Sequence, residues 1–185
     1  MDIIGKIHPP SSRRQSFILV ATDYFTKWIE AVPLANVTYQ EVIKFVKEHI
    51  IHRYGISQTI TTDQGTVFTF AAQQTGRPKQ PIKLIGEIKK AVEDNPRRWH
   101  EVLGEALWAC IQYRNKATGC TPFQLVYGLE AILPLEITVP SLRVLKQNSL
   151  SPEQYDTTML QRLDDVQEDR MMALENIRAN KVKVA

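Results

Sequence analysis

The sequence predicts an α/β fold built on a mixed sheet and followed by a separate helical tail. Two observations predict the sheet: short apolar runs of strand length crowd residues 1–34, and another follows a helical pattern at residues 58–62. A strand, a helix and a strand in that order imply a crossover connection, and therefore strands of mixed direction. With 185 residues, 43% of them hydrophobic, the chain is long enough for one well-buried core.

Three strands are predicted in the N-terminal part of the chain. Ile3 and Ile4 belong to the first, and residues 16–33 form the next two around a tight connection at residues 23–27. Residues 9–12 include two prolines and mark the first turn, because proline cannot donate to a strand ladder. Strands that follow one another so closely most simply form an antiparallel meander.

A helix is predicted from Thr38 to Tyr54. Thr38 and Glu41 form a capping box at its start, and Gly55 follows as a C-terminal stop. The positions that recur at helical spacing are Val42, Phe45, Val46, His49 and Ile50.

The middle of the chain is predicted to alternate between turns and helices. Residues 63–65, Asp-Gln-Gly, form a turn at the end of the short strand 58–62. Residues 70–81 are predicted as a loop, because two prolines block a long helix there. Helical spacing resumes in residues 82–92 and 99–110, and an Asn-Pro step separates these two helices.

Three domains are predicted: a core at residues 1–128, a proline-containing linker at 129–152 and an amphipathic helical tail at 153–185. The tail has an apolar seam interrupted by Arg170, and it spans fewer than three full heptads, which argues against a stable coiled coil on its own. The tail therefore seeks a partner, packs on the core or extends free of it. The seam positions are Met159, Leu163, Val166, Arg170, Ala173 and Ile177.

Positive charge is concentrated in one stretch of the chain. Residues 77–98 contain seven bases and three acids, a net charge of +4, whereas the whole chain carries +3. Such a stripe favours polyanion binding, because each neutralised phosphate releases counterions; a solvated helix face is the alternative. The candidate nucleic-acid-binding residues are Arg77, Lys79, Lys83, Lys89 and Lys90.

Other classes of protein are disfavoured by the sequence. No apolar run approaches the roughly 18 to 20 residues that span a bilayer, and the first residues lack the features of a secretory signal, so we expect an intracellular protein without a membrane partner. Cys110 and Cys120 are the two cysteines, and we expect buried thiols rather than a disulfide or a zinc site. Nothing predicts a small-molecule substrate.

Two aspartates are candidate metal ligands. Asp2 begins the first predicted strand and Asp63 ends the fourth, so neighbouring strands could bring the two carboxylates together. Nearby carboxylates repel each other unless a cation neutralises them, and Mg²⁺ prefers oxygen ligands. Taken alone, each residue favours a bland role, Asp63 in a turn and Asp2 as a solvated terminal charge.

Several segments of the chain resemble, in order, the motifs of the integrase core of gypsy-type long-terminal-repeat retrotransposons. The resemblance covers roughly residues 1 to 150. It implies an RNase H-like fold, and two aspartates and a glutamate that hold two ions of Mg²⁺ or Mn²⁺ for cutting and joining DNA ends. Nuclear location, DNA binding and multimers are further implications. The matching segments are residues 2–6, 17–31, 54–57, 61–65, 98–103 and 121–128.

The resemblance assigns the first two catalytic metal ligands to Asp2 and Asp63, and not to the conspicuous Asp23. In the family the third carboxylate follows the second by about thirty-five residues, after a loop that residues 73–76 resemble. Its position here falls on Lys79, 16 residues after Asp63. About twenty residues are therefore missing near residues 66–80, which would remove about one strand and one helix.

The resemblance thus implies a polynucleotidyl transferase that is catalytically impaired in this copy. Glu87 and Glu93 are the nearby acids, and each lies on a helix whose register the prolines disturb. Three alternatives remain: a nucleic-acid-binding module without chemistry, an oligomerising remnant that associates with itself or with full-length integrase, and a shortened sheet that does not fold stably.

Overall fold

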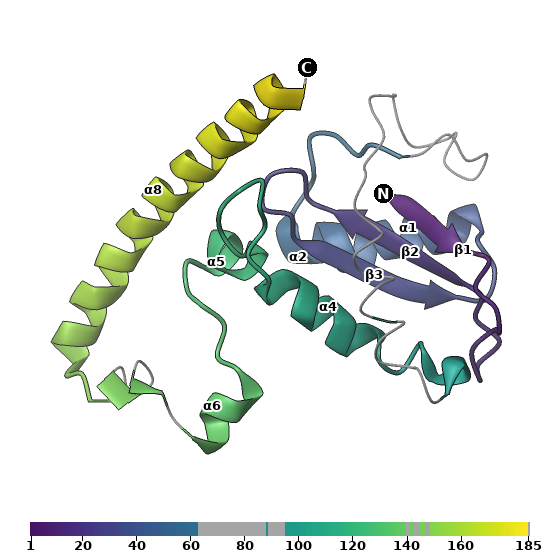
Figure 1. Cartoon of the computed structure of the whole chain (residues 1–185), viewed down its shortest axis with the longest axis horizontal. Coiled ribbons are helices and arrows are strands. Elements are labelled where there is room, and N and C mark those ends of the chain that lie inside the picture. Colours follow the sequence, from purple (N-terminus) through teal and green to yellow (C-terminus); the bar gives the residue numbers. More distant parts are fainter. Residues whose placement is uncertain (63–87, 89–94, 140, 143–144, 147–148, 185) are drawn as a thin grey trace. The chain divides into compact units, whose positions relative to one another are not determined.

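A computed structural model of the chain describes residues 1–62, 88, 95–139, 141–142, 145–146 and 149–184 (Figure 1). It divides into two compact units. Unit 1 comprises residues 1–23 and 29–110, and unit 2 comprises residues 24–28 and 111–185.

Unit 1 is built on an antiparallel meander. Its described strands are β1 (Asp2–Gly5), β2 (Phe17–Thr22) and β3 (Ile29–Leu34), in the order β1-β2-β3. Asp2 lies opposite Val20, and Val20 lies opposite Ala31. The predicted meander is therefore confirmed.

The central strand β2 has buried side chains on both faces of the sheet. Alternate side chains of a strand point to opposite sides. Leu19 and Ala21 point to the face that packs against Val42 and Phe45 of the following helix, whereas Ile18 and Val20 point to the other face. Leu19 is completely buried. Figure 1 shows the helix segments α1 and α2 behind the sheet and α4 in front of its lower edge.

The predicted helix is confirmed, with a change of geometry in its middle. It consists of α1 (Tyr39–Phe45), a π-helical segment η1 (Val46–Ile51) and α2 (His52–Tyr54). The Thr38 hydroxyl accepts a hydrogen bond of 3.3 Å from the Glu41 backbone N–H, which supplies one half of the predicted capping box. Gly55 ends the helix with a φ of +83°, a conformation that favours glycine.

The predicted strand at residues 58–62 is wrong. The structure gives these residues no strand pairing, so the sheet of the described residues is antiparallel rather than mixed. The physical reason is that Ile60 is the single apolar side chain in Gln-Thr-Ile-Thr-Thr, and it is half-buried. So little apolar surface does not offset the entropy of ordering the segment as a strand.

The remainder of unit 1 follows the segment that the structure leaves undescribed. Most of the predicted helix 82–92 lies outside the described residues. The second predicted helix, at residues 99–110, begins later than expected, as α4 (Leu103–Gln112), and a 3-10 turn η3 (Pro96–Arg98) precedes it. Asn95 caps the turn by accepting from the Arg97 N–H at 3.3 Å.

Unit 2 contains α5 (Pro122–Tyr127), α6 (Pro134–Thr138) and the long tail helix α8 (Pro152–Val184). The stretch expected to be a linker therefore includes a short helix. Thr121 caps α5, and Gly128 ends it in the left-handed conformation at φ +73°. Among the described residues, no helix is both long enough and apolar enough to cross a membrane.

Helix α8 packs on residues 117–128 of the same unit. Val166, Ala173 and Ile177 of the predicted seam are buried, but Leu163 is 63% exposed, contrary to expectation. Arg170 lies on the seam because its guanidinium donates to the backbone carbonyls of Leu125 at 3.0 Å and Val126 at 3.3 Å. These carbonyls belong to the last turn of α5, where a helix offers unpaired acceptors.

Candidate functional site

Asp2 is the first residue of β1, and its side chain is half-buried. Its Oδ1 accepts a hydrogen bond of 2.8 Å from the Ile3 backbone N–H. Residues directly opposite each other in an antiparallel pair lie on the same face, so Asp2 shares a sheet face with Val20 and Ala31. This is the face away from α1.

A hydrogen bond ties the start of β1 to the segment that leads to Asp63. The Met1 amino group donates to the Thr61 carbonyl across 60 residues of sequence. Burial lowers the pKa of this amino group, and the neighbouring Asp2 charge acts in the opposite direction. Asp63 itself lies outside the described residues, but it follows Thr61 by two positions. Sequence reasoning expected neighbouring strands to bring Asp2 and Asp63 together; the structure shows one backbone contact between Met1 and Thr61, and the meeting of the two carboxylates stays a prediction.

The remaining predicted site residues lie outside the described part of the chain. They are the five bases Arg77, Lys79, Lys83, Lys89 and Lys90 and the two acids Glu87 and Glu93. Asp23, which the resemblance excludes as a ligand, is exposed just beyond β2. Within the described ranges there is no cluster of three or more His, Cys, Asp or Glu side chains placed to hold a metal.

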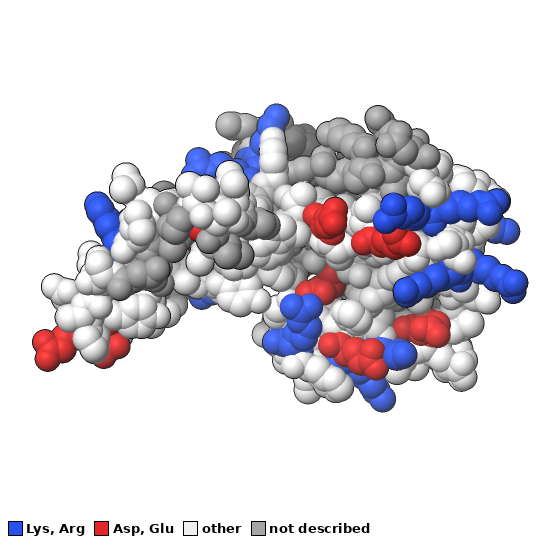
Figure 2. Space-filling view, turned by 90° about the horizontal axis from the view of Figure 1, so that it is seen from below, with Lys and Arg blue, Asp and Glu red and all other residues white. Residues whose placement is uncertain are grey.

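The C-terminal end of the basic stretch 77–98 is described by the structure, and an acid there offsets part of its positive charge. Arg98 Nε donates to Glu101 Oε2 at 2.6 Å, and this hydrogen bond lowers the pKa of the exposed Glu101 carboxyl. Figure 2 shows acidic and basic side chains intermixed on the face in view. The described charges on that face therefore do not form an unbroken basic patch.

Sequence reasoning missed a polar cluster around Glu30 in unit 1. Glu30 is 8% exposed although it lies in β3. Arg53 Nη1 and the Tyr54 hydroxyl each donate to its Oε1 at 2.7 Å, and His49 Nδ1 lies 3.8 Å from Oε2. A single acid inside an apolar strand run was the available signal, since buried carboxylates need partners. The cluster fixes the helix end to the sheet.

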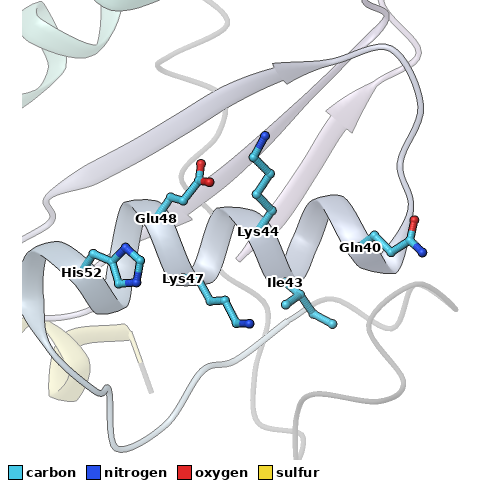
Figure 3. Close-up of a pocket in the computed structure, with 6 residues that line it drawn as sticks. All are labelled: Gln40, Ile43, Lys44, Lys47, Glu48 and His52. Carbon is cyan, nitrogen blue, oxygen red and sulfur yellow. The ribbon is translucent and has the colours of Figure 1, made fainter.

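A shallow hollow of about 350 Å³ runs along the outer face of the same helix (Figure 3). It is remote in sequence from Asp2 and Asp63 and offers no grouping of metal ligands. Its lining residues are Gln40, Ile43, Lys44, Lys47, Glu48 and His52.

Comparison with known proteins identifies relatives. No family model matches the chain. It is 24% identical over 200 positions to the gypsy retrotransposon integrase-like protein 1 of Macaca fascicularis, covering 97% of this chain and 38% of that protein. It is 27% identical over 173 positions to the Pol polyprotein of feline endogenous virus ECE1, covering 82% of this chain and 16% of that protein. The chain is a homologue of gypsy retrotransposon integrase-like proteins and retroviral Pol polyproteins.

The fold agrees with this relationship. The HTLV-2 integrase catalytic core domain, solved in complex with magnesium in a trimeric form, matches with a TM-score of 0.50 and 18% identity. The match covers 66% of this chain and 93% of that domain. The chain therefore has an RNase H-like α/β fold, and the three antiparallel strands with their helices are a truncated version of it.

The lengths of the alignments bear on the shortened core. The alignment with the macaque protein runs over 200 positions, but 97% of 185 residues is about 179 residues. The alignment with the feline virus protein runs over 173 positions, but 82% of 185 residues is about 152. In both, a total of about 21 positions of the relative have no counterpart in this chain. The chain spans well under half the length of either relative.

Proposed function

We propose that this chain is an integrase core-like protein that binds DNA and whose ancestral chemistry, metal-dependent DNA strand transfer, is impaired in this copy. The hydrogen bond from the Met1 amino group to the Thr61 carbonyl carries the proposal for the site. Asp2 and Asp63 follow these two residues by one and two positions, and two residues of chain span at most about 7 Å. This short span leaves room for the two carboxylates to share one cation, which is what the proposal requires.

The residues fit a divalent ion in part. Two carboxylates that approach each other favour a hard cation such as Mg²⁺ or Mn²⁺, which prefers oxygen ligands and retains water. The Ile3 N–H occupies one acceptor position on Asp2 Oδ1, and a carboxylate offers about four. Asp2 and Asp63 would hold the ion, whose chemistry would be to neutralise charge on a DNA phosphate. A complete two-metal site does not fit, because Lys79 stands where the resemblance expects the glutamate.

The missing carboxylate is the reason to expect impairment. The total of about 21 positions that each of two relatives has and this chain lacks is as large as the proposed loss of about twenty residues between the second and third ligands. In two-metal catalysis each ion contributes several kcal/mol of charge stabilisation, so losing one slows the reaction by about a thousandfold or more. An ammonium at the glutamate position adds repulsion toward any cation.

A strand-transfer assay tests this proposal. With Mg²⁺ or Mn²⁺, we expect the unsubstituted chain to join no more DNA ends than Asp63→Asn, the matched control. Metal-dependent joining above the Asp63→Asn level would refute the impairment.

A second experiment tests the metal site. Binding of Mn²⁺, followed by electron paramagnetic resonance, should weaken in both Asp2→Asn and Asp63→Asn, and remain unchanged in Asp23→Asn. Equal Mn²⁺ affinity in all four proteins would refute the metal site.

DNA binding is proposed to run through the basic stretch 77–98. We expect affinity for a DNA duplex to fall steeply with salt, because counterion release contributes a slope of about 0.9 per neutralised phosphate. Lys79→Glu with Lys83→Glu should lower both the affinity and that slope. Lys44→Glu with Lys47→Glu is the matched control, since both lysines are exposed and outside the stretch. Affinity that does not change with salt would contradict the proposal.

The second candidate function is a non-catalytic, nucleic-acid-binding or oligomerising remnant of a retroelement polyprotein. The native Lys79 favours this candidate, because it stands where the resemblance expects the metal-binding glutamate and carries a positive charge instead. DNA binding together with the absence of joining would select this candidate. Nuclear location belongs to either proposal, and imaging of a fluorescently tagged chain in cells tests it.

A further inference from the structure

Helix α8 has a second apolar strip that is not used in packing against residues 117–128. Four large side chains on it are exposed to between 43% and 65% of their surface, and Gln167 lies at its centre, also exposed. The strip runs beside the buried seam of Val166, Ala173 and Ile177 rather than along it. Its apolar members are Leu160, Leu163, Met171 and Leu174.

The strip is symmetric about Gln167. Leu163 and Met171 each lie four residues from Gln167, and Leu160 and Leu174 each lie seven residues from it. The spacings along the strip are three, four, four and three residues, so all five side chains lie on one side of the helix. Two such helices in antiparallel orientation would therefore place Leu160 against Leu174 and Leu163 against Met171, twice each.

The charges of α8 follow the same symmetry. Residues 153–169 contain six acids and one base, whereas residues 170–183 contain four bases and one acid. The register that pairs the apolar residues also pairs Asp156 with Arg178, both exposed, and the backbone position of Glu153 with that of Lys181. A parallel arrangement would instead oppose acid to acid and base to base, which is unfavourable.

We propose that the strip Leu160, Leu163, Gln167, Met171 and Leu174 binds a second copy of this chain, in an antiparallel helix pair with its two-fold axis at Gln167. Charge complementarity between the two halves of α8 and the symmetric spacing select this occupant over an unrelated helix. At the axis, the Gln167 amide faces its own copy, and an amide can both donate and accept. A central polar residue fixes register, as buried asparagine does in coiled coils. The inference does not depend on the proposed DNA chemistry.

Sedimentation equilibrium of the full chain over a concentration series tests the interface. We expect a monomer–dimer equilibrium whose dissociation constant rises at least about tenfold in Leu163→Asp, because each symmetric dimer then opposes two buried charges to methionine. Gln161→Asp introduces the same charge at an exposed position of the same helix outside the strip, and should leave the constant unchanged. Circular dichroism confirms that helix content is kept. A wild-type monomer at all concentrations, or a dimer equally strong in Leu163→Asp, would overturn the proposal.

Charge reversal tests the orientation. Asp156→Arg and Arg178→Asp should each weaken the dimer, and the double variant should restore it, because only antiparallel helices pair residue 156 with residue 178.

Cysteine cross-linking tests the same register. Under an added oxidant, a mixture of Leu160→Cys and Leu174→Cys chains should form a disulfide-linked dimer. Either variant alone should form no more of it than the unsubstituted protein. Residues 160 and 174 lie about 21 Å apart along a helix, too far for a disulfide. Cross-linking of Leu160→Cys to itself, or failure of the double variant to restore association, would overturn the antiparallel register.

Discussion

The two units of the chain are stabilised by different interactions. In unit 1, Leu19 and Ala21 of the sheet pack against Val42 and Phe45 of the helix, side chain against side chain. In unit 2, three side chains of α8 donate hydrogen bonds to backbone carbonyls of residues 117–126. They are Arg170, Asn176 and Asn180. Apolar packing tolerates small movements of the backbone, whereas bonds to carbonyls require a close and fixed approach. Unit 1 should therefore be sensitive to lost volume and unit 2 to a blocked approach.

The largest effect is expected for Leu19→Ala in unit 1. Leu19 is 0% exposed, so the substitution leaves a cavity between the sheet and α1. The free energy of unfolding of unit 1 should fall by about 3 kcal/mol. Urea unfolding followed by circular dichroism measures it. Ile56→Ala is the control, because Ile56 is 88% exposed, and a comparable loss there would show that burial is not the cause.

Gly128→Ala should destabilise unit 2 by about 2 kcal/mol, through strain and steric overlap rather than lost volume. Gly128 has a φ of +73°, and an added Cβ would lie 2.2 Å from Val166 Cγ2 of α8. The double variant with Val166→Ala removes that methyl group and should recover part of the loss relative to Val166→Ala alone. A double-mutant cycle of urea unfolding measures the coupling. Strict additivity would contradict the close approach of α8 to α5.

Glu30→Gln tests whether unit 1 also depends on a polar contact. The substitution keeps the shape of the side chain but removes the charge that Arg53 and the Tyr54 hydroxyl contact at 2.7 Å. We expect a loss of about 1 kcal/mol in the free energy of unfolding, because Arg53 is nearly half exposed and water screens the pair. Glu48→Gln is the control: it removes a charge at an exposed position on the helix that carries Arg53, and it should not measurably change the free energy of unfolding. An equal loss in both would assign the effect to net charge.

Unit 1 could be predicted from the sequence better than unit 2, because apolar packing leaves a periodic pattern in the sequence and hydrogen bonds to backbone carbonyls do not. Strand and helix periodicity expose which side chains meet, so the meander and the helix from Thr38 are predicted. The fourth strand is wrong because Ile60 is too small an apolar contribution to hold it against the sheet. Arg170 looked like a defect of the tail seam, because periodicity contains no information about where another segment leaves unpaired carbonyls.

The candidate site could be predicted only as residue types and order. Asp2 is found in β1 as expected, but its link to the Asp63 segment is a backbone contact at Thr61, which no side-chain pattern encodes. Glu30 was missed for a related reason: its partners lie 19 to 24 residues away, at the far end of a helix. Contacts between elements depend on how the elements pack, and the local pattern of each element does not contain that.

The smallest expected effect is a pH dependence at Cys120 in unit 2. Burial raises the pKa of this thiol, the Asp169 charge adds to the increase, and Arg114 opposes it. An unfolded thiol titrates near 8.5, so above about pH 8.5 the unfolded chain loses its proton first and unfolding is favoured. The stability that Cys120 contributes is therefore complete below that pH and is lost as the pH rises toward the folded pKa.

Comparison of the unsubstituted chain with Cys120→Ala isolates this dependence. The free energy of unfolding of the unsubstituted chain should fall more between pH 7 and pH 9.5 than that of the variant. Alkylation in a Cys110→Ser background gives a second measure, because Cys120 then reacts alone and slowly. Adding Gly128→Ala should speed this reaction, since Cys120 packs in one cluster with Leu125 of α5 and Ala173 of α8. An unchanged rate would mean that Cys120 is shielded without α8, and the contrast between the two units would then be weaker than the contacts indicate.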